Sequence, residues 1–267
     1  MSRSATPEVM PGCEPWSAAG SGDHAATTVV LCHGFTGNPL ATRPLGEVLN
    51  AAGFGVEVVR LPGHGTSVDD LRTTRYADWR GAVETAVDRA RNTAGVERVV
   101  LVGHSMGGTI SLDVASARPD DIAGIVAINA VILEPTQLLA RLAPLLQYVI
   151  PVVPRDLAGL PTDDIARPDV SETAYPKVSA RAAQSLMSNL ARIRSQLLDL
   201  TMPLMVVMSP QDHTVEAHNS DTIVELVGSS DIRRITCDRS YHVPQLDWDR
   251  ELVEQSVLTF VTDVHGA

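Results

Sequence analysis

The chain has 267 residues, of which 44% are hydrophobic and 20% charged, and its formal net charge is −11. This composition is ordinary for a globular protein, and the length suits one large domain or one domain with an insertion. A surface this acidic repels phosphate backbones and anionic lipid headgroups, so we expect no nucleic-acid partner.

Residues 1–26 are rich in small residues, Pro and Gly, which predicts a loose arm or a short edge hairpin. This segment has no apolar stretch long enough for the core of a signal peptide, and no run in the chain approaches the ~18 apolar residues of a membrane span. We therefore expect a cytoplasmic protein with no integral membrane segment. Three widely spaced cysteines favour neither a disulfide framework nor a zinc site: Cys13, Cys32 and Cys237.

Short apolar strand patterns alternate with helix patterns in two parts of the chain. The first part predicts strands at 27–32, 55–61, 97–103 and 122–129, with helices at 42–53, 76–95 and 105–119. The second predicts strands at 202–209 and 231–237, with helices at 214–228 and 249–264. Strands that are apolar throughout and alternate with helices indicate an α/β protein with a mostly parallel, doubly wound sheet. In such sheets, functional residues gather at the carboxyl ends of the strands.

Residues 131–200 interrupt this alternation and contain no convincing strand pattern. Two helical stripes of apolar residues occur there, and Pro144 should kink the first. The first stripe is Leu138, Leu139, Leu142, Leu145, Leu146 and Val149, and the second is Ala183, Leu186, Met187, Leu190, Ile193 and Leu197. We expect residues 131–200 to be an insertion in a core formed by 1–130 and 201–267, with these apolar stripes packed onto that core.

GHSMG (103–107) fits the pattern G-x-S-x-G and stands between a predicted strand and a predicted helix. A serine at such a sharp turn adopts a strained backbone conformation, so its neighbours must be small. Gly103 and Gly107 meet that need, and the turn points the hydroxyl and the helix N-terminus into the cleft. The pentapeptide alone is a weak signal, but in this position it predicts that Ser105 is a nucleophile rather than a capping serine.

A nucleophilic serine needs a base to take its proton, and His242 is the best-placed histidine. It follows the last predicted strand in CDRSYHVPQLD, on a loop at a carboxyl end. His104 is adjacent to the serine and cannot reach back to its hydroxyl. We therefore expect His242 to be the base.

The base in turn needs a carboxylate that fixes its tautomer and stabilises the imidazolium. Asp212, in MSPQDHTV, ends the strand at 202–209 and is the expected acid. Glu134, just after the strand at 122–129, remains the alternative. Asp238 and Asp247 are near the histidine in sequence, but local solvated or capping roles suit them better.

An acyl-transfer site also needs donors for the oxyanion. The backbone N–H of Met106, directly after the serine, is one expected donor. HGFTG (33–37) follows the first strand, where Gly34 lets the backbone turn inward and Phe35 supplies the second N–H.

Together HGFTG, LPGHG, GHSMGG, the strand-end Asp212 and SYHVPQLD resemble the α/β-hydrolase superfamily, and more narrowly its bacterial carboxylesterases and monoacylglycerol lipases. The resemblance spans roughly 27–130 and 202–264 and includes the chain order serine, aspartate, histidine. It implies a serine hydrolase that cleaves carboxylic esters of short- to medium-chain acyl groups through an acyl-enzyme on Ser105. It also implies that residues 131–200 form a helical cap, under which we expect an acyl chain or another apolar group of the substrate. By the same resemblance, His64 is a structural residue behind the site. Two departures, Tyr241 before the histidine and Ser209 at the acid turn in place of glycine, could reshape the pocket wall.

Other functions use related machinery. A cofactor-free perhydrolase or a carbon–carbon bond hydrolase would use the same triad, and a non-catalytic ligand-binding scaffold would keep the fold. Arg141, Arg155 and Arg167 leave room for a carboxylate-recognising pocket. HTVEAH (213–218) lacks the spacing of a zinc motif, so we expect neither metal nor cofactor. The expected partner is a small ester, and the oligomeric state stays open.

Overall fold

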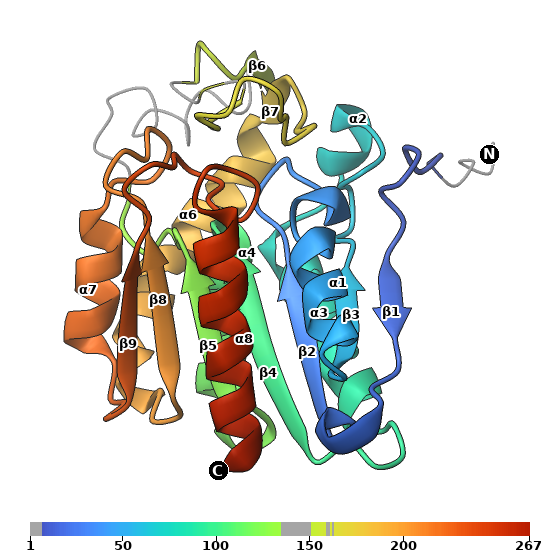
Figure 1. The fold of residues 1–267 in the computed structure, drawn as a ribbon. Helices are drawn as coiled ribbons and strands as arrows, with labels where there is room; N and C mark the ends of the chain where they lie inside the picture. The colour runs from blue at the N-terminus through green and yellow to red at the C-terminus, as the bar shows by residue number, and fades with distance from the viewer. Residues whose placement is uncertain (1–6, 135–150, 159–160, 162) are drawn as a thin grey trace.

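A computed structural model describes residues 7–134, 151–158, 161 and 163–267 of the protein. A seven-stranded sheet runs through its centre in the order β1-β3-β2-β4-β5-β8-β9 (Figure 1). All neighbouring strands are parallel except β1, which is antiparallel to β3. The strands are β1 (Trp16–Ala18), β2 (Thr27–Cys32), β3 (Gly55–Val59), β4 (Arg98–His104), β5 (Gly124–Ile128), β8 (Leu204–Met208) and β9 (Ile232–Thr236). The predicted α/β class with a mostly parallel sheet is confirmed.

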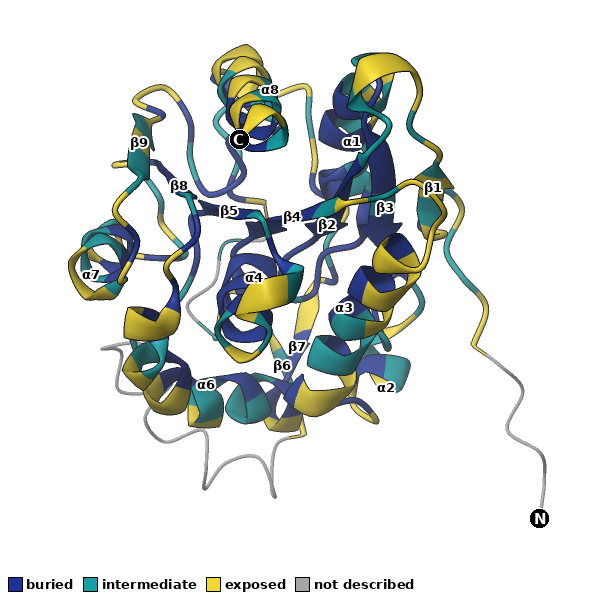
Figure 2. Ribbon diagram, turned by 90° about the horizontal axis from the view of Figure 1, so that it is seen from below, coloured by how far each residue is buried: buried dark blue, intermediate teal, exposed yellow. Residues whose placement is uncertain are grey.

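Helices cover both faces of the sheet (Figure 2). On one face lie α1 (Arg43–Ala51) and α8 (Arg250–Gly266), and on the other α3 (Tyr76–Arg91) and α4 (Met106–Ala117). The described residues also form the short α2 (Val68–Leu71), α6 (Ala180–Ser195), which packs against α3 and α4, and α7 (His218–Leu226), which packs against β8. The sheet is therefore the middle of three layers.

Successive side chains of a strand point to opposite sides. Because helices cover both sides of the sheet, both sets of side chains in the central strands are buried. Val30 and Leu101 face the helices α3 and α4, where Trp79 is fully buried. Leu31 and Val100 face the opposite layer, which contains Phe260. Close packing on both sides makes the strand ends a rigid platform for the loops that follow them.

The inserted segment, residues 131–200, differs from the prediction. Its described residues include the short strands β6 (Val152–Pro154) and β7 (Lys177–Ser179), which pair antiparallel above the carboxyl ends of the main sheet (Figure 1). The prediction of no strand here was wrong, because three residues are too few to show a period of two. The second apolar stripe forms α6 and buries Leu186, Leu190 and Ile193, whereas the first stripe lies outside the described residues.

The N-terminal arm forms an edge strand of the main sheet instead of a hairpin. Trp16 pairs with Val58, and Arg43 lies over the Trp16 ring. Within the described ranges, no helix combines the length and apolar character needed to cross a bilayer.

Candidate active site

Ser105 lies in the tight turn between β4 and α4, with φ 53° and ψ −122°. Such a conformation is costly for a residue with a side chain and persists only where the surroundings enforce it. Its N–H donates to the carbonyl of Ile128, 2.8 Å away on the neighbouring strand. A Cβ at Gly103 would lie 2.2 Å from the Gly107 carbonyl oxygen, and one at Gly107 would lie 2.2 Å from that of Cys32. Both glycines of GHSMG are therefore required by this turn.

His242 and Asp212 form a buried pair at the ends of β9 and β8. The Nδ1 of His242 lies 2.7 Å from Asp212 Oδ2, so the imidazole N–H donates to the carboxylate. The other carboxylate oxygen accepts the backbone N–H groups of Thr214 and Val215, both at 2.7 Å. These three contacts fix the carboxylate and with it the ring orientation of the histidine.

The backbone of His242 is held by two further side chains. Its carbonyl oxygen accepts from His104 Nε2 at 2.8 Å and from Asn129 Nδ2 at 2.9 Å. Asn129 also receives the N–H of Ser209, which begins the turn that carries Asp212. Burial lowers the pKa of His104 well below its ordinary value, so this ring is a neutral donor. One asparagine after β5 thus ties the acid turn to the histidine loop.

The electrostatic surroundings of His242 favour its protonated form. Burial by itself lowers the pKa of this imidazole, but the charge and hydrogen bond of Asp212 raise it, and Glu172 and Asp164 add to the effect. The net result is a pKa above the ordinary histidine value. A histidine beside a carboxylate gains basicity in this way and can hold a proton during a reaction.

Glu134, the alternative acid, lies elsewhere. Its carboxylate pairs with Arg194 at 3.0 Å, and half of its side chain is exposed. Partial burial by itself raises the pKa of Glu134, but the hydrogen bonds with Arg194 lower it further, and the net pKa is below the ordinary value. The carboxylate that contacts His242 belongs to Asp212.

The turn after β2 comes close to Ser105. A Cβ at Gly34 would lie 3.2 Å from the Cβ of Ser105 and 3.2 Å from His104 Nδ1, so the absence of a side chain there sets this distance. Burial lowers the pKa of His33 to about 4, and the neutral ring donates from Nδ1 to the Gly34 carbonyl at 2.9 Å. These contacts place Phe35 at the edge of the cleft, opposite the first turn of α4, whose leading N–H groups have no partner within the helix.

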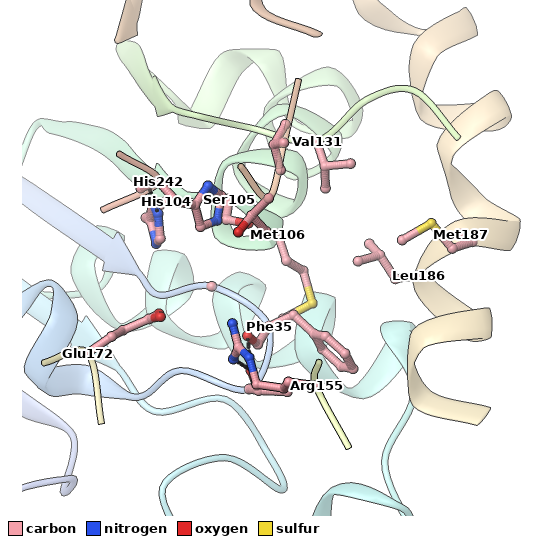
Figure 3. Close-up of a pocket in the computed structure, with 14 residues that line it drawn as sticks. Phe35, His104, Ser105, Met106, Val131, Arg155, Glu172, Leu186, Met187 and His242 are labelled. Carbon is pink, nitrogen blue, oxygen red and sulfur yellow. Dashed lines mark hydrogen bonds between the residues drawn. The ribbon is translucent and has the colours of Figure 1, made fainter. Parts of the chain in front are cut away.

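A pocket opens beside Ser105 (Figure 3). Its apolar lining consists of Phe35, Met106, Val131, Leu186, Met187 and Val215, and its polar lining includes Thr36, Arg155, Glu172, Thr214, His104 and His242. Figure 3 shows the apolar side chains of α6 on one side and Glu172 on the other, with Ser105 between them. His64 lies behind the pocket wall, with its ring 6.1 Å from that of Phe35 and 5.5 Å from that of Trp79.

Glu172 and Arg155 belong to the inserted segment, and of the two only Arg155 was a candidate from the sequence, as a carboxylate binder. Arg155 is buried and donates to Thr36 Oγ1 at 2.6 Å and to the Pro161 carbonyl at 2.8 Å. Glu172 is buried too, and burial raises its carboxyl pKa although His242 and Arg155 act in the opposite direction. The residues around the glutamate show no periodic pattern that would have indicated a place in the pocket.

Comparisons with known proteins identify the family of the chain. A sequence model of the family described as serine aminopeptidase, S33 matches residues 23–249. The chain is 32% identical to the thermostable monoacylglycerol lipase of Bacillus sp. (strain H-257) over 261 residues, which cover 94% of this chain and 95% of that protein. It is 28% identical to the carboxylesterase of Bacillus subtilis (strain 168), over 87% of this chain and 91% of that protein.

Solved structures of lipolytic enzymes have a similar fold. A structure described under LipS and LipT, two metagenome-derived lipolytic enzymes, has a TM-score of 0.88 at 29% identity and covers 96% of this chain and 100% of its own. The monoacylglycerol lipase of Paleococcus ferrophilus has the same fold, with a TM-score of 0.77 at 22% identity and coverage of 94% and 99%.

The parallel sheet and the serine turn between β4 and α4 define an α/β-hydrolase. The chain belongs to the family of serine hydrolases whose model matches residues 23–249. It is a carboxylic ester hydrolase, and the family, fold and activity expected from the sequence are confirmed.

Proposed function

We propose that Ser105, His242 and Asp212 are the catalytic triad of this ester hydrolase. The observation that carries the proposal is the buried 2.7 Å contact between His242 and Asp212, at the same pocket as the strained Ser105 turn. In this mechanism His242 takes the proton of the Ser105 hydroxyl as the oxygen attacks the ester carbonyl. The imidazolium then gives that proton to the leaving alcohol, and an acyl-enzyme remains.

Water completes the reaction by the same route. His242 takes a proton from the water that attacks the acyl-enzyme, and returns it to Ser105 as the acid leaves. The raised pKa of His242 supports this role, because Asp212 stabilises the imidazolium formed in both steps. The net reaction converts an ester and water into a carboxylic acid and an alcohol.

The backbone N–H groups of Phe35 and Met106 are the proposed donors to the oxyanion. The close approach at Gly34 brings the Phe35 turn to the nucleophile, and Met106 begins α4 directly after it. Amides held in this way need no reorganisation when negative charge develops on the carbonyl oxygen.

We further propose that the inserted segment acts as a cap whose apolar side binds the acyl group. Leu186 and Met187 on α6 line the pocket together with Phe35, Met106 and Val215. Burying each CH₂ of an acyl chain there contributes about 0.8 kcal/mol, so a chain-length preference follows.

The opposite, polar side suits an alcohol that carries free hydroxyls. The buried Glu172 offers carboxylate oxygens to hydroxyl donors, and Thr36 and Thr214 line the same pocket. A monoacylglycerol has an apolar acyl chain and two free hydroxyls, and relatives at 32% and 28% identity are named a monoacylglycerol lipase and a carboxylesterase. We propose monoacylglycerols and related short- to medium-chain esters as substrates, and a cytoplasmic location stays a prediction.

The experiment is hydrolysis of a chain-length series of p-nitrophenyl esters and monoacylglycerols, by the wild type and by Ser105→Ala. We expect serine-dependent turnover with an optimum above the acetyl ester. A protein that prefers acetyl esters would contradict the acyl site under the cap. A folded protein inactive on every ester would contradict the proposed substrates.

A further inference from the structure

Asp247 joins the inserted segment to the loop that carries His242. Its carboxylate is buried and accepts four backbone N–H groups, two at each oxygen. Oδ2 accepts from Ala166 at 2.7 Å and Tyr241 at 3.0 Å, and Oδ1 accepts from Arg167 at 3.0 Å and Trp248 at 2.8 Å. Each oxygen therefore binds one amide of the inserted segment and one amide of the His242 loop. The solvated role that the sequence suggested for Asp247 is wrong, because its side chain is buried. Its bonds within the His242 loop are two of the four.

Asp164 makes a second connection, from the inserted segment to the acid turn. Its carboxylate is buried and accepts from His213 twice, from the backbone N–H at 3.0 Å and from ring Nδ1 at 2.8 Å. It also accepts from Thr214 Oγ1 at 3.0 Å. Both donor residues directly follow Asp212, and the His213 ring packs edge-on against Tyr241, with 4.5 Å between the centroids. The two carboxylates thus act on neighbouring loops.

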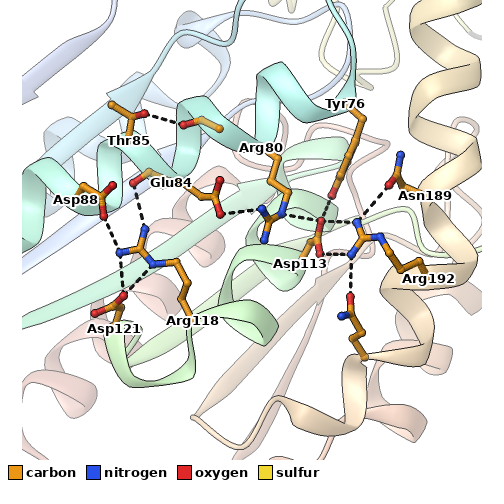
Figure 4. Close-up of polar contacts among 12 residues, drawn as sticks. Tyr76, Arg80, Glu84, Thr85, Asp88, Asp113, Arg118, Asp121, Asn189 and Arg192 are labelled. Carbon is orange, nitrogen blue, oxygen red and sulfur yellow. Dashed lines mark hydrogen bonds and ion pairs between the residues drawn. The ribbon is translucent and has the colours of Figure 1, made fainter.

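A third connection from the inserted segment makes no bond to either of these loops and provides a comparison. Arg192 on α6 forms a bidentate ion pair with the buried Asp113 on α4, with both N···O distances at 2.8 Å (Figure 4). Tyr76 and Arg80 on α3 donate to the same carboxylate. This cluster attaches α6 to the helices of the core and touches neither Asp212 nor His242.

We propose that Asp164 and Asp247 are positioning residues through which residues 163–167 of the inserted segment hold Asp212 and His242 in register. The inference rests on the proposed roles of that pair. The acid turn and the His242 loop are irregular, so side-chain carboxylates accept many of their backbone N–H groups in place of a helix or strand partner. Loss of one carboxylate removes the shared acceptor of several loop donors and lets a loop shift. A displacement near 1 Å can reduce the rate of a positioned reaction by about 100-fold. On this view these residues are a fixed part of the active site and not a moving lid.

Asparagine substitution separates the two carboxylates cleanly. In Asp247→Asn, the single amide oxygen accepts only one pair of N–H groups, and the NH₂ group faces the other pair. In Asp164→Asn, the oxygen still accepts the His213 N–H and the Thr214 hydroxyl, while the NH₂ group donates to the other tautomer of His213. Asp164→Ala removes all three contacts. The positioning role therefore predicts damage in Asp247→Asn and Asp164→Ala, and rescue in Asp164→Asn.

The test measures kcat and KM on p-nitrophenyl butyrate and the melting temperature of each variant, with Asp113→Asn as the control. We expect kcat to fall roughly 10- to 100-fold in Asp247→Asn and Asp164→Ala, with KM within about threefold of the wild type. Asp164→Asn should recover most of kcat. Asp113→Asn should lose thermal stability but keep kcat within about twofold, because its ion pair does not touch the catalytic loops.

The downfield proton resonance of the His242 Nδ1–H is a second readout. It should be unchanged in Asp113→Asn and Asp164→Asn, and shifted or broadened in Asp247→Asn and Asp164→Ala. Near-normal kcat in the two damaging variants would overturn the inference, and so would an equal loss of kcat in Asp113→Asn at matched stability. Should Asp247→Asn fail to fold, the Asp164 pair decides the question. None of these outcomes tests the proposed function itself. Activity in Ser105→Ala would reject that function.

Discussion

Asp212 presents one oxygen to His242, 2.7 Å from Nδ1, while its other oxygen binds the backbone N–H groups of its own turn. The carboxylate is therefore oriented before any substrate arrives. Only one face of it remains for the imidazole, so the tautomer with hydrogen on Nδ1 is favoured and Nε2 is left to accept a proton. This arrangement is what a serine nucleophile needs from its base.

Asp212→Asn should lower kcat by roughly 10²–10⁴-fold, because an amide stabilises the imidazolium poorly and can favour the wrong tautomer. Glu134→Gln should leave kcat within about twofold of the wild type, because Glu134 pairs with Arg194. Steady-state kinetics on one p-nitrophenyl ester distinguishes the two. The reverse ranking would make Glu134 the acid.

Gly34→Ala tests the oxyanion turn. The added methyl group would lie 3.2 Å from Ser105 Cβ and from His104 Nδ1, so the turn must shift and move the Phe35 amide. We expect kcat to fall roughly 10- to 100-fold. Gly81→Ala on α3 is the matched control, since its methyl group meets nothing within 4 Å and should stabilise the helix by about 0.5–1 kcal/mol. Equal activity of the two variants would reject the role of the Phe35 turn.

Glu172→Gln should shift the pH dependence of activity. His242 is a base only when neutral, so kcat/KM falls as pH drops through its pKa. Glu172 contributes to raising the pKa of His242, and removal of this charge lowers it. The acid limb of the kcat/KM profile should therefore move to lower pH on p-nitrophenyl butyrate. A limb that stays in place or moves upward would contradict the electrostatic coupling.

The same variant tests the polar side of the pocket. Glu172→Gln replaces one acceptor oxygen with an NH₂ group that cannot accept. A hydrogen bond contributes about 0.5–1.5 kcal/mol, so kcat/KM for a monoacylglycerol should fall by roughly 2- to 10-fold. A p-nitrophenyl ester of the same acyl chain has no hydroxyl to lose and should be much less affected. Equal effects on both substrates would count against hydroxyl binding by Glu172.

Asp113→Asn should destabilise the fold by about 1–3 kcal/mol. Burial by itself raises the pKa of Asp113, but hydrogen bonds from Arg192 and Tyr76 outweigh it and hold the pKa below its ordinary value. The stability contributed by this lowered pKa is present above the ordinary carboxyl pKa of about 4 and is lost as pH falls through the lowered value. Denaturant melts should show a gap between wild type and variant near neutral pH that narrows in acid. A gap of constant size would argue against the ion pair as its source.

Local sequence patterns were sufficient to predict most of the fold and the Ser105 turn. The central strands β2, β4, β5 and β8 are short, mainly apolar runs that end at polar turns. The strained Ser105 conformation depends on glycines within a few residues of it. Asp212 and His242 lie 30 residues apart and meet because β8 and β9 are parallel neighbours. Strand order therefore converts two separate loop positions into one contact.

The parts of the site that the sequence did not predict depend on the inserted segment. Glu172 reaches the pocket because its neighbours are fastened to the turn after β2: the Tyr175 N–H donates to the Thr36 carbonyl, and Asn38 donates to Thr173. These contacts join residues more than 130 positions apart and leave no periodic pattern. The burial of Asp247 was missed for the same reason, because half of its partners come from residues 166–167.

Direct detection of the acyl-enzyme tests the central claim, that Ser105 is the nucleophile. The wild type, Asp212→Asn and Ser105→Ala would each be mixed with excess p-nitrophenyl ester, quenched in acid within the first turnover and analysed by peptide mass spectrometry. We predict an acyl group on the peptide that contains Ser105 in the wild type, slower formation of the same adduct in Asp212→Asn, and no adduct or turnover in Ser105→Ala. An acyl group on another residue, or full turnover by Ser105→Ala, would contradict the mechanism.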